Sequence, residues 1–129
     1  TQRNALLVRR TLDAYRPSLH LIEQADINAN IRAISLPGHT PGHTGYLIYS
    51  GNERLLIWGD IVHYPHIQLA RPEVSISFDH DPVLAETTRK TIVEQVVRDH
   101  TRIAGMHFGE SAAFGHIERN STTGYLLRA

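Results

Sequence analysis

The sequence predicts a mixed fold of helices and strands, in the α/β (α+β) class, and three observations support it. Apolar residues alternate with polar ones in several short runs, as they do in half-buried strands. Two longer stretches carry apolar residues at helical spacing, one near the N-terminus and one after position 80. Turn-forming residues separate these segments, so helices and strands alternate along the chain, which is typical of the α/β class.

The first third of the chain predicts one helix and then extended segments. Residues 2–15 have the apolar spacing of a helix, and Pro17 ends it. A short strand could follow at residues 19–22, whereas residues 23–30 are polar and turn-like. Residues 31–36 alternate apolar and polar side chains, and we expect a half-buried strand there.

The middle of the chain predicts a hairpin and then a loop. Residues 45–49 and 54–58 are rich in β-forming side chains, and the Ser-Gly-Asn-Glu segment between them is a hairpin signal. Residues 61–77 contain two prolines, two histidines and scattered apolar side chains. We expect this segment to be an irregular loop that lines a pocket.

The last third predicts a helix followed by strands. Asp81 is a good N-cap and a proline follows it at the first helical position, so a helix should run from there to about His100. Residues 102–106 predict the next strand, residues 109–124 a loop rich in glycine and polar residues, and residues 125–127 a closing strand.

Composition argues against several classes of protein and partner. The 13 basic and 13 acidic residues balance, which argues against nucleic acid or an anionic membrane as a partner. Cysteine is absent, so disulfides, cysteine-ligated metals and a thiol nucleophile are excluded. No apolar run is long enough to cross a bilayer. We expect a cytoplasmic protein with a small-molecule substrate.

Three segments place metal-binding residue types where predicted strands end. Residues 36–44 read LPGHTPGHT and contain His39 at the end of a strand. Asp60 follows the second arm of the hairpin, and His107 follows the strand after the long helix. Imidazole nitrogens and a carboxylate bind zinc, and strand ends hold such side chains in place. We therefore expect a metal site.

These motifs, in this order, resemble the metallo-beta-lactamase superfamily and its lactonase and organophosphate-hydrolase-like branch. The likeness rests on G-H-T-P-G-H, then G-D after a hairpin, then a late strand that ends in histidine. Residues 77–82 (SFDHDP), 105–108 (GMHF) and 115–117 (GHI) also fit it. The resemblance covers the chain from about Ile31 onward. It implies the C-terminal half of an αββα sandwich, with the metal site along the edge of the two sheets.

The family's first metal motif, H-x-H-x-D-H, is absent, because no two of the nine histidines are separated by a single residue. We therefore interpret residues 1–129 as a single domain, the C-terminal part of a metallo-beta-lactamase-like domain whose N-terminal half is missing. Such a half should expose an apolar face. It should be inactive and poorly stable alone, or pair with a second copy as a homodimer.

The resemblance implies roles for three residues. His39 would bind the first metal, Asp60 would bridge two metals, and His107 would bind the second. Two Zn²⁺ ions per full-length chain are expected, with iron or manganese as alternatives. A metal-bound hydroxide would attack a lactone, ester or phosphoester, and Asp60 would be catalytic through its bridging position. Structural histidines, and an aspartate that only caps a turn, are the competing interpretations.

Two other histidines lie near these motifs. His63 stands three residues after Asp60, where related lactonases have a tyrosine that assists ring opening. A histidine there could itself donate a proton and be catalytic, and a solvated loop histidine is the alternative. We expect His43 in a hydrogen bond that holds the loop rather than on the metal.

Several further side chains have more than one interpretation. Asp79 and Asp81 suggest a carboxylate pair, but the helix cap explains Asp81 better. Phe108 and Phe114 could form an apolar wall for a substrate, or could belong to the core. His116 could line the mouth of the pocket, but a place in a surface loop is favoured.

Two other functions stay open. An iron-binding redox protein of the same fold could use the same histidine and aspartate ligands. A non-catalytic half-domain, serving only in binding or assembly, would explain why the first metal motif is missing.

Overall fold

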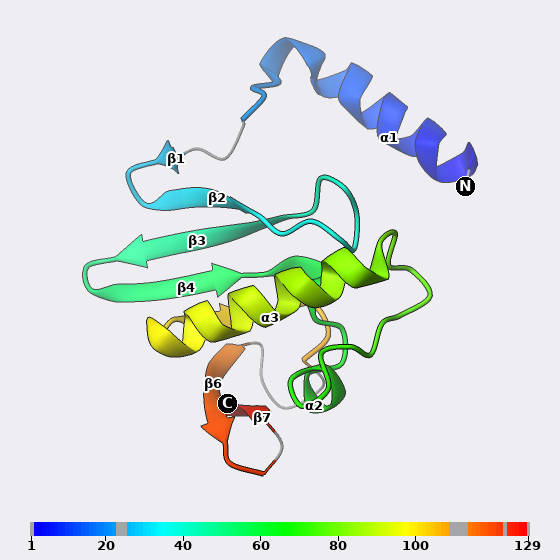
Figure 1. The fold of residues 1–129 in the computed structure, drawn as a ribbon. Helices are drawn as coiled ribbons and strands as arrows, with labels where there is room; N and C mark the ends of the chain where they lie inside the picture. Colours follow the sequence, from blue (N-terminus) through cyan, green and yellow to red (C-terminus); the bar gives the residue numbers. More distant parts are fainter. Residues whose placement is uncertain (1, 23–25, 109–113, 123, 129) are drawn as a thin grey trace.

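A seven-stranded sheet forms the centre of the molecule (Figure 1). The computed structural model describes residues 2–22, 26–108, 114–122 and 124–128. The strands lie in chain order across the sheet: β1 (Asp26–Asn28), β2 (Ile31–Ser35), β3 (Thr44–Ser50), β4 (Glu53–Ile57), β5 (Arg102–Ala104), β6 (Phe114–Asn120) and β7 (Gly124–Arg128). The helices are α1 (Gln2–Tyr15), α2 (Pro65–Gln68) and α3 (Pro82–Arg98), with 3-10 turns η1 (Arg16–Ser18) and η2 (Gly59–Ile61).

All neighbouring strands are antiparallel except β4 and β5, which are parallel. A parallel pair needs a long crossover, and α3 supplies it. The Asp81 side chain caps α3, because its Oδ1 accepts a hydrogen bond from the Leu84 N–H at 3.0 Å. The predicted α/β class, the N-terminal helix, the hairpin and the capped helix are all confirmed.

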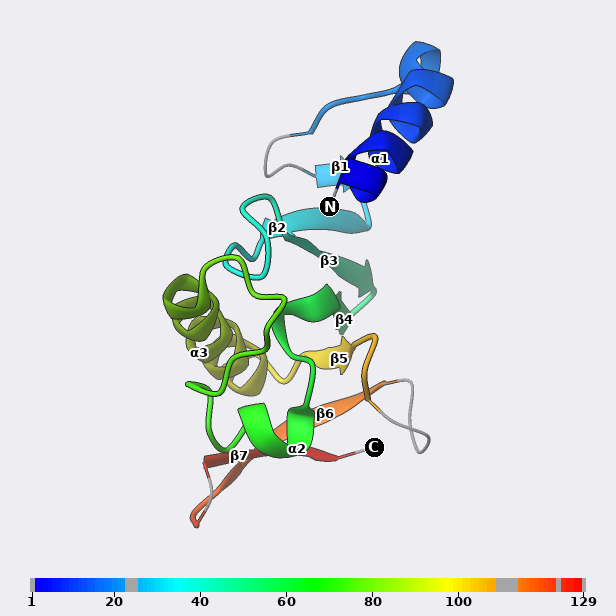
Figure 2. The same ribbon diagram turned by 90° about the vertical axis from the view of Figure 1, so that its right-hand side faces the viewer.

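The hydrophobic core lies between α3 and one face of the sheet, and Figure 2 shows α3 on that side. Alternate residues of each strand point to this face, so Leu56 of β4 and Ile103 of β5 are fully buried beside Ile92 of α3. The buried members of this cluster are Leu36, Leu56, Trp58, Ile61, Val62, Leu69, Ala85, Ile92, Val93, Val96, Ile103, Phe108 and Ile117.

The opposite face of the sheet is apolar but only partly covered. Tyr46 is 38% exposed and Phe114 is 49% exposed, and Ile48 and Leu55 between them are half-buried. The guanidinium of Arg102 lies 5.3 Å from the centre of the Phe114 ring. Phe114 therefore belongs neither to the core nor to the wall of a pocket beside the histidines.

The structure corrects two expectations near the N-terminus. Residues 19–22 are an exposed connection and not a strand, whereas Asp26–Asn28, expected to be a turn, form β1. Backbone pairing with β2 forms this strand, and an ion pair at 2.7 Å from Arg32 Nε to the Asp26 carboxylate crosses it. Polar composition does not reveal such a strand. Residues 23–25 lie outside the described residues.

The expected loop at residues 109–124 is also wrong over Phe114–Asn120, which form β6. This strand is antiparallel to both β5 and β7. Its composition of glycine and polar residues does not predict a strand. Position 115 nevertheless requires a glycine, because a Cβ there would lie 2.1 Å from the Arg128 carbonyl oxygen. Residues 109–113 lie outside the described residues.

Two smaller findings complete the fold. Residues 61–77 form the expected irregular segment, apart from the single turn of α2. No described helix is long and apolar enough to cross a membrane.

Candidate metal centre

The order of the sheet brings the ends of three strands together at one edge. Strands β2 and β4 each run antiparallel to β3, and β5 runs parallel to β4. The C-terminal ends of β2, β4 and β5 therefore face the same way. His39, Asp60 and His107 follow these three ends, so residues far apart in the sequence meet at this edge.

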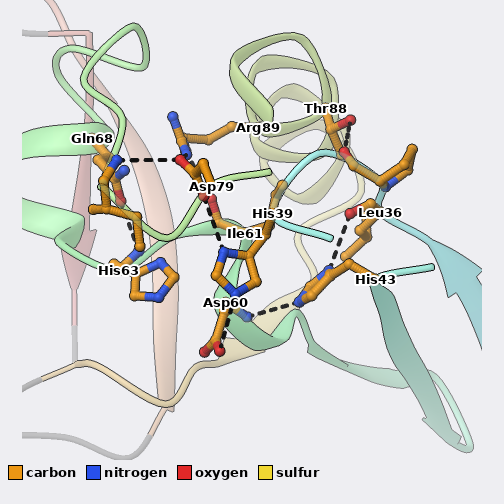
Figure 3. A network of polar contacts seen from close by, with 12 residues as sticks. Leu36, His39, His43, Asp60, Ile61, His63, Gln68, Asp79, Thr88 and Arg89 are labelled. Atoms are coloured by element: carbon orange, nitrogen blue, oxygen red, sulfur yellow. Dashed lines mark hydrogen bonds and ion pairs between the residues drawn. The ribbon is translucent and has the colours of Figure 1, made fainter. Parts of the chain in front are cut away.

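The Asp60 carboxylate lies between two imidazoles. Its Oδ2 is 3.7 Å from His39 Nε2, and its Oδ1 is 3.4 Å from His107 Nε2. One carboxylate oxygen thus faces each histidine, which is the arrangement that a bridging ligand needs. Figure 3 shows the Asp60 and His39 side chains pointing toward each other.

His63 lies beside this group and is buried, so the alternative of a solvated loop histidine is wrong, while its catalytic role stays a prediction. Its ring stacks on that of His107, with centroids 4.6 Å apart, and lies 4.9 Å from the ring of His39. Burial lowers the pKa of His63 below its usual value, although the Asp60 carboxylate acts in the opposite direction. A neutral ring is therefore favoured at this position.

Unpartnered polar atoms indicate that the group fits a metal ion. Asp60 Oδ1 and His63 Nδ1 are buried and have no hydrogen-bond partner among the described residues. Native proteins rarely leave such atoms unpaired, and an ion is one common explanation. Ligand atoms of His39, Asp60 and His63 also lie within 4.8 Å of one another. Imidazole nitrogens and a carboxylate are ligands that suit zinc or iron.

His43 holds the segment before Asp60 and is not free to bind a metal. Its Nε2 accepts a hydrogen bond from the Asp60 N–H at 3.0 Å, and its Nδ1 donates to the Leu36 carbonyl at 3.1 Å. Accepting at one nitrogen and donating at the other requires the neutral imidazole. Burial lowers the pKa of His43, which favours this form. The expected loop-holding role is confirmed.

Gln68 fixes the segment that carries His63. This residue is fully buried, and its Oε1 accepts from the backbone N–H of His63 at 2.7 Å and of Tyr64 at 3.0 Å. Its Nε2 donates to the Val74 carbonyl at 2.8 Å. One amide side chain therefore ties together both ends of the irregular segment. No local pattern marks Gln68 for this role, because a single glutamine among scattered apolar residues carries no positional signal.

Asp79 pairs with His39 and not with Asp81, which caps α3, so the suggested carboxylate pair is wrong. Asp79 Oδ1 lies 3.0 Å from His39 Nδ1, and the Asp79 side chain has no exposed surface. Arg89, from the middle of α3, is fully buried close to Asp79 (Figure 3). These residues lie 40 and 50 positions after His39, so no local pattern connects them with it.

A cavity of about 640 Å³ opens on this group. Its lining residues are His39, Asp60, His63, Tyr64, Ile76, Ser77, Phe78 and His107. Phe108 lies instead in the core, edge-on to Trp58 at 5.7 Å between ring centroids. His116 is exposed on β6 rather than in a loop, and it is not among the lining residues.

Comparison with known proteins adds a family and several structural neighbours. The family model of the metallo-beta-lactamase superfamily matches residues 19–107. No curated protein sequence matches the chain. AidC, described as a dizinc quorum-quenching lactonase in complex with a product, N-hexnoyl-L-homoserine, is 26% identical with a TM-score of 0.83. The similarity covers 95% of this chain and 41% of AidC.

Two further solved structures are similar. AbOPH, described as a hydrolase in the beta lactamase superfamily, is 28% identical with a TM-score of 0.79, over 90% of this chain and 40% of AbOPH. A probable metal-dependent hydrolase from Staphylococcus aureus is 19% identical with a TM-score of 0.69, over 88% and 41% of the two chains, which supports the fold alone. The present chain thus spans about two fifths of the length of these neighbours.

Proposed function

We propose, from the premise that this chain belongs to the metallo-beta-lactamase superfamily, that it carries part of the active site of a metal-dependent hydrolase. The observation that carries the proposal is the meeting of three strand ends at the Asp60 carboxylate, whose buried Oδ1 has no hydrogen-bond partner among the described residues. Because the chain spans about two fifths of its structural neighbours, the activity is proposed for the full-length protein.

Three residues would hold the metal ions in this proposal. His39 and His107 would each bind one zinc ion, and Asp60, which faces both imidazoles, would bridge the pair. When bound, the ions would supply Lewis acidity and lower the pKa of coordinated water toward neutrality. His43 keeps the Asp60 carboxylate between the two histidines by binding the Asp60 N–H.

His63 would face the substrate. Its ring lines the cavity, and both the stack on His107 and the Gln68 bond to its backbone hold it in place. A neutral imidazole carries one N–H donor, which can bond to an oxygen on which negative charge develops. We therefore propose that His63 donates a hydrogen bond to the leaving oxygen or the carbonyl oxygen of the substrate.

The cavity supports a small substrate with an apolar part. Ile76 and Phe78 give its wall an apolar surface, and Ser77 and Tyr64 add hydroxyl groups. We propose a lactone, an ester or a phosphoester as the substrate class. The description of AidC as a lactonase and of AbOPH as a hydrolase supports this class.

The test is hydrolysis by the zinc-loaded full-length protein on a panel of lactone, thioester and phosphotriester substrates. Asp60→Asn should abolish turnover on every substrate that the wild type hydrolyses, because the bridging carboxylate is lost. Asp26→Asn is the matched control, since Asp26 lies on β1 and pairs only with Arg32 among the described residues. Turnover that survives in Asp60→Asn would contradict the proposal. Tightly bound iron with redox activity would also contradict it, and would favour an iron-binding redox protein of the same fold.

A further inference from the structure

The hydrogen bond between Asp79 and His39 determines which nitrogen of His39 is free. Asp79 Oδ1 lies 3.0 Å from His39 Nδ1, and the carboxylate is fully buried. A carboxylate only accepts hydrogen bonds, so Nδ1 must carry the proton and donate it. The lone pair then lies on Nε2, which is the nitrogen that faces Asp60. Asp79 therefore selects the tautomer in which His39 can bind a metal toward Asp60.

Asp79 is itself held from two sides. Its Oδ2 accepts a hydrogen bond from the Ile76 N–H at 3.3 Å and lies 3.6 Å from Arg89 Nη2. Both the Asp79 and the Arg89 side chains have no exposed surface. The two charges thus compensate each other away from water as an ion pair without a hydrogen bond at Arg89 Nη2, and the Ile76 N–H bond helps to fix Asp79 behind His39.

Arg89 also binds the segment that follows Asp60. Its Nε donates to the Ile61 carbonyl at 2.7 Å, and Ile61 is the residue directly after Asp60. Its Nη1 donates to the Pro72 and Val74 carbonyls. The rigid fork of a guanidinium can reach several acceptors at fixed angles, which a lysine ammonium on a flexible stem does not do.

We infer that Asp79 and Arg89 form a buried positioning pair that presents His39 and Asp60 to a metal ion as one unit. Asp79 orients His39 through Nδ1, and Arg89 holds both Asp79 and the backbone next to Asp60. Neither residue touches the substrate cavity. The inference rests on the proposed function to the extent that His39 is taken as a metal ligand.

The first measurement is the tautomer of His39 in the metal-free full-length protein, from long-range nitrogen–proton NMR spectra at mildly alkaline pH. The wild type should show the proton on Nδ1. A proton on Nε2 would overturn the inference, whatever the activity of the protein. An Nδ1 proton in a protein that hydrolyses nothing would instead leave the inference standing and remove the proposed function.

The second measurement compares variants by zinc affinity and by kinetics. Asp79→Asn should mix the His39 tautomers and weaken zinc binding about 10- to 100-fold, the usual effect of losing such a partner. With saturating zinc its KM should stay near that of the wild type while kcat falls, because the cavity wall is unchanged. Zinc affinity within about twofold of the wild type, against the tenfold or more expected, would overturn the inference.

Two further variants separate positioning from stability. Thr88→Val removes the 2.7 Å hydrogen bond from the Thr88 hydroxyl to the Pro37 carbonyl, which holds the same loop through its backbone rather than through the His39 side chain. This variant should lose stability yet keep the wild-type tautomer and zinc affinity. Arg89→Lys keeps the buried charge without the fork, and should weaken zinc binding in the same direction as Asp79→Asn. If Asp79→Asn does not fold, the wild-type tautomer and Arg89→Lys decide the question.

Discussion

Gly59→Ala should destabilise the protein more than Gly51→Ala, although both glycines have a φ of +59°. A Cβ at position 51 would meet nothing within 4 Å, whereas a Cβ at position 59 would lie 2.7 Å from His43 Nε2. The left-handed conformation costs a non-glycine residue about 1–2 kcal/mol, and both variants carry this penalty. The difference between them therefore isolates the contact with His43.

The size of that difference follows from the hydrogen bonds of His43. The ring must move away from the new methyl group, and it then loses its bond to the Asp60 N–H. A donor left unpaired in a partly buried site costs about 1–3 kcal/mol. Gly59→Ala should thus lower the free energy of unfolding by about 2–5 kcal/mol, against about 1–2 kcal/mol for Gly51→Ala.

Urea unfolding of the two metal-free variants in the full-length protein measures this difference directly. With unchanged m-values, the shifts in midpoint report the two free energies of unfolding. Gly59→Ala should also weaken zinc binding, because the Asp60 backbone loses its support, and Gly51→Ala should not. Equal destabilisation of the two variants, within about 0.5 kcal/mol, would refute the role assigned to His43.

Two other substitutions give separate checks on the loop and the helix beside the site. Gly38→Ala should prevent correct folding, because its φ is +129° and a Cβ would lie 2.3 Å from the Ala85 backbone nitrogen. Gly42→Ala is its control, with nothing within 4 Å, and thermal melts followed by circular dichroism should separate the two. Asp81→Ala removes the cap on the Leu84 N–H and should lower the free energy of unfolding by about 1 kcal/mol, without changing zinc affinity. A large loss of zinc binding in Asp81→Ala would mean that α3 itself, rather than particular side chains, governs the site.

Local patterns account for the parts of the fold that the sequence predicted. The helix at Gln2–Tyr15 and the capped helix at Pro82–Arg98 have clear spacing and end signals, and both are confirmed. The strand at Phe114–Asn120 was missed because its neighbours in the sheet, and not its own composition, make it a strand. β1 at Asp26–Asn28 escaped prediction for the same reason.

The residues of the site likewise fall into those that the sequence predicts and those that only the structure reveals. His39, Asp60 and His107 could be predicted, because each follows a recognisable strand and the ends of strands collect at sheet edges. The structure places the His39 and His107 imidazoles beside the Asp60 carboxylate. The roles of these three residues as metal ligands stay a prediction. The link of Asp79 and Arg89 to His39 could not be predicted, because only the tertiary fold brings the middle of α3 behind the loop that carries His39.

Zinc binding by the metal-free full-length protein tests the central claim most directly. The wild type should bind about two zinc ions per chain, and His39→Gln, Asp60→Asn and His107→Gln should each weaken that binding. His116→Gln is the matched control, because His116 is exposed on β6 and is not among the residues that line the cavity, and it should bind zinc as the wild type does. Wild-type zinc binding in all three site variants would contradict the account.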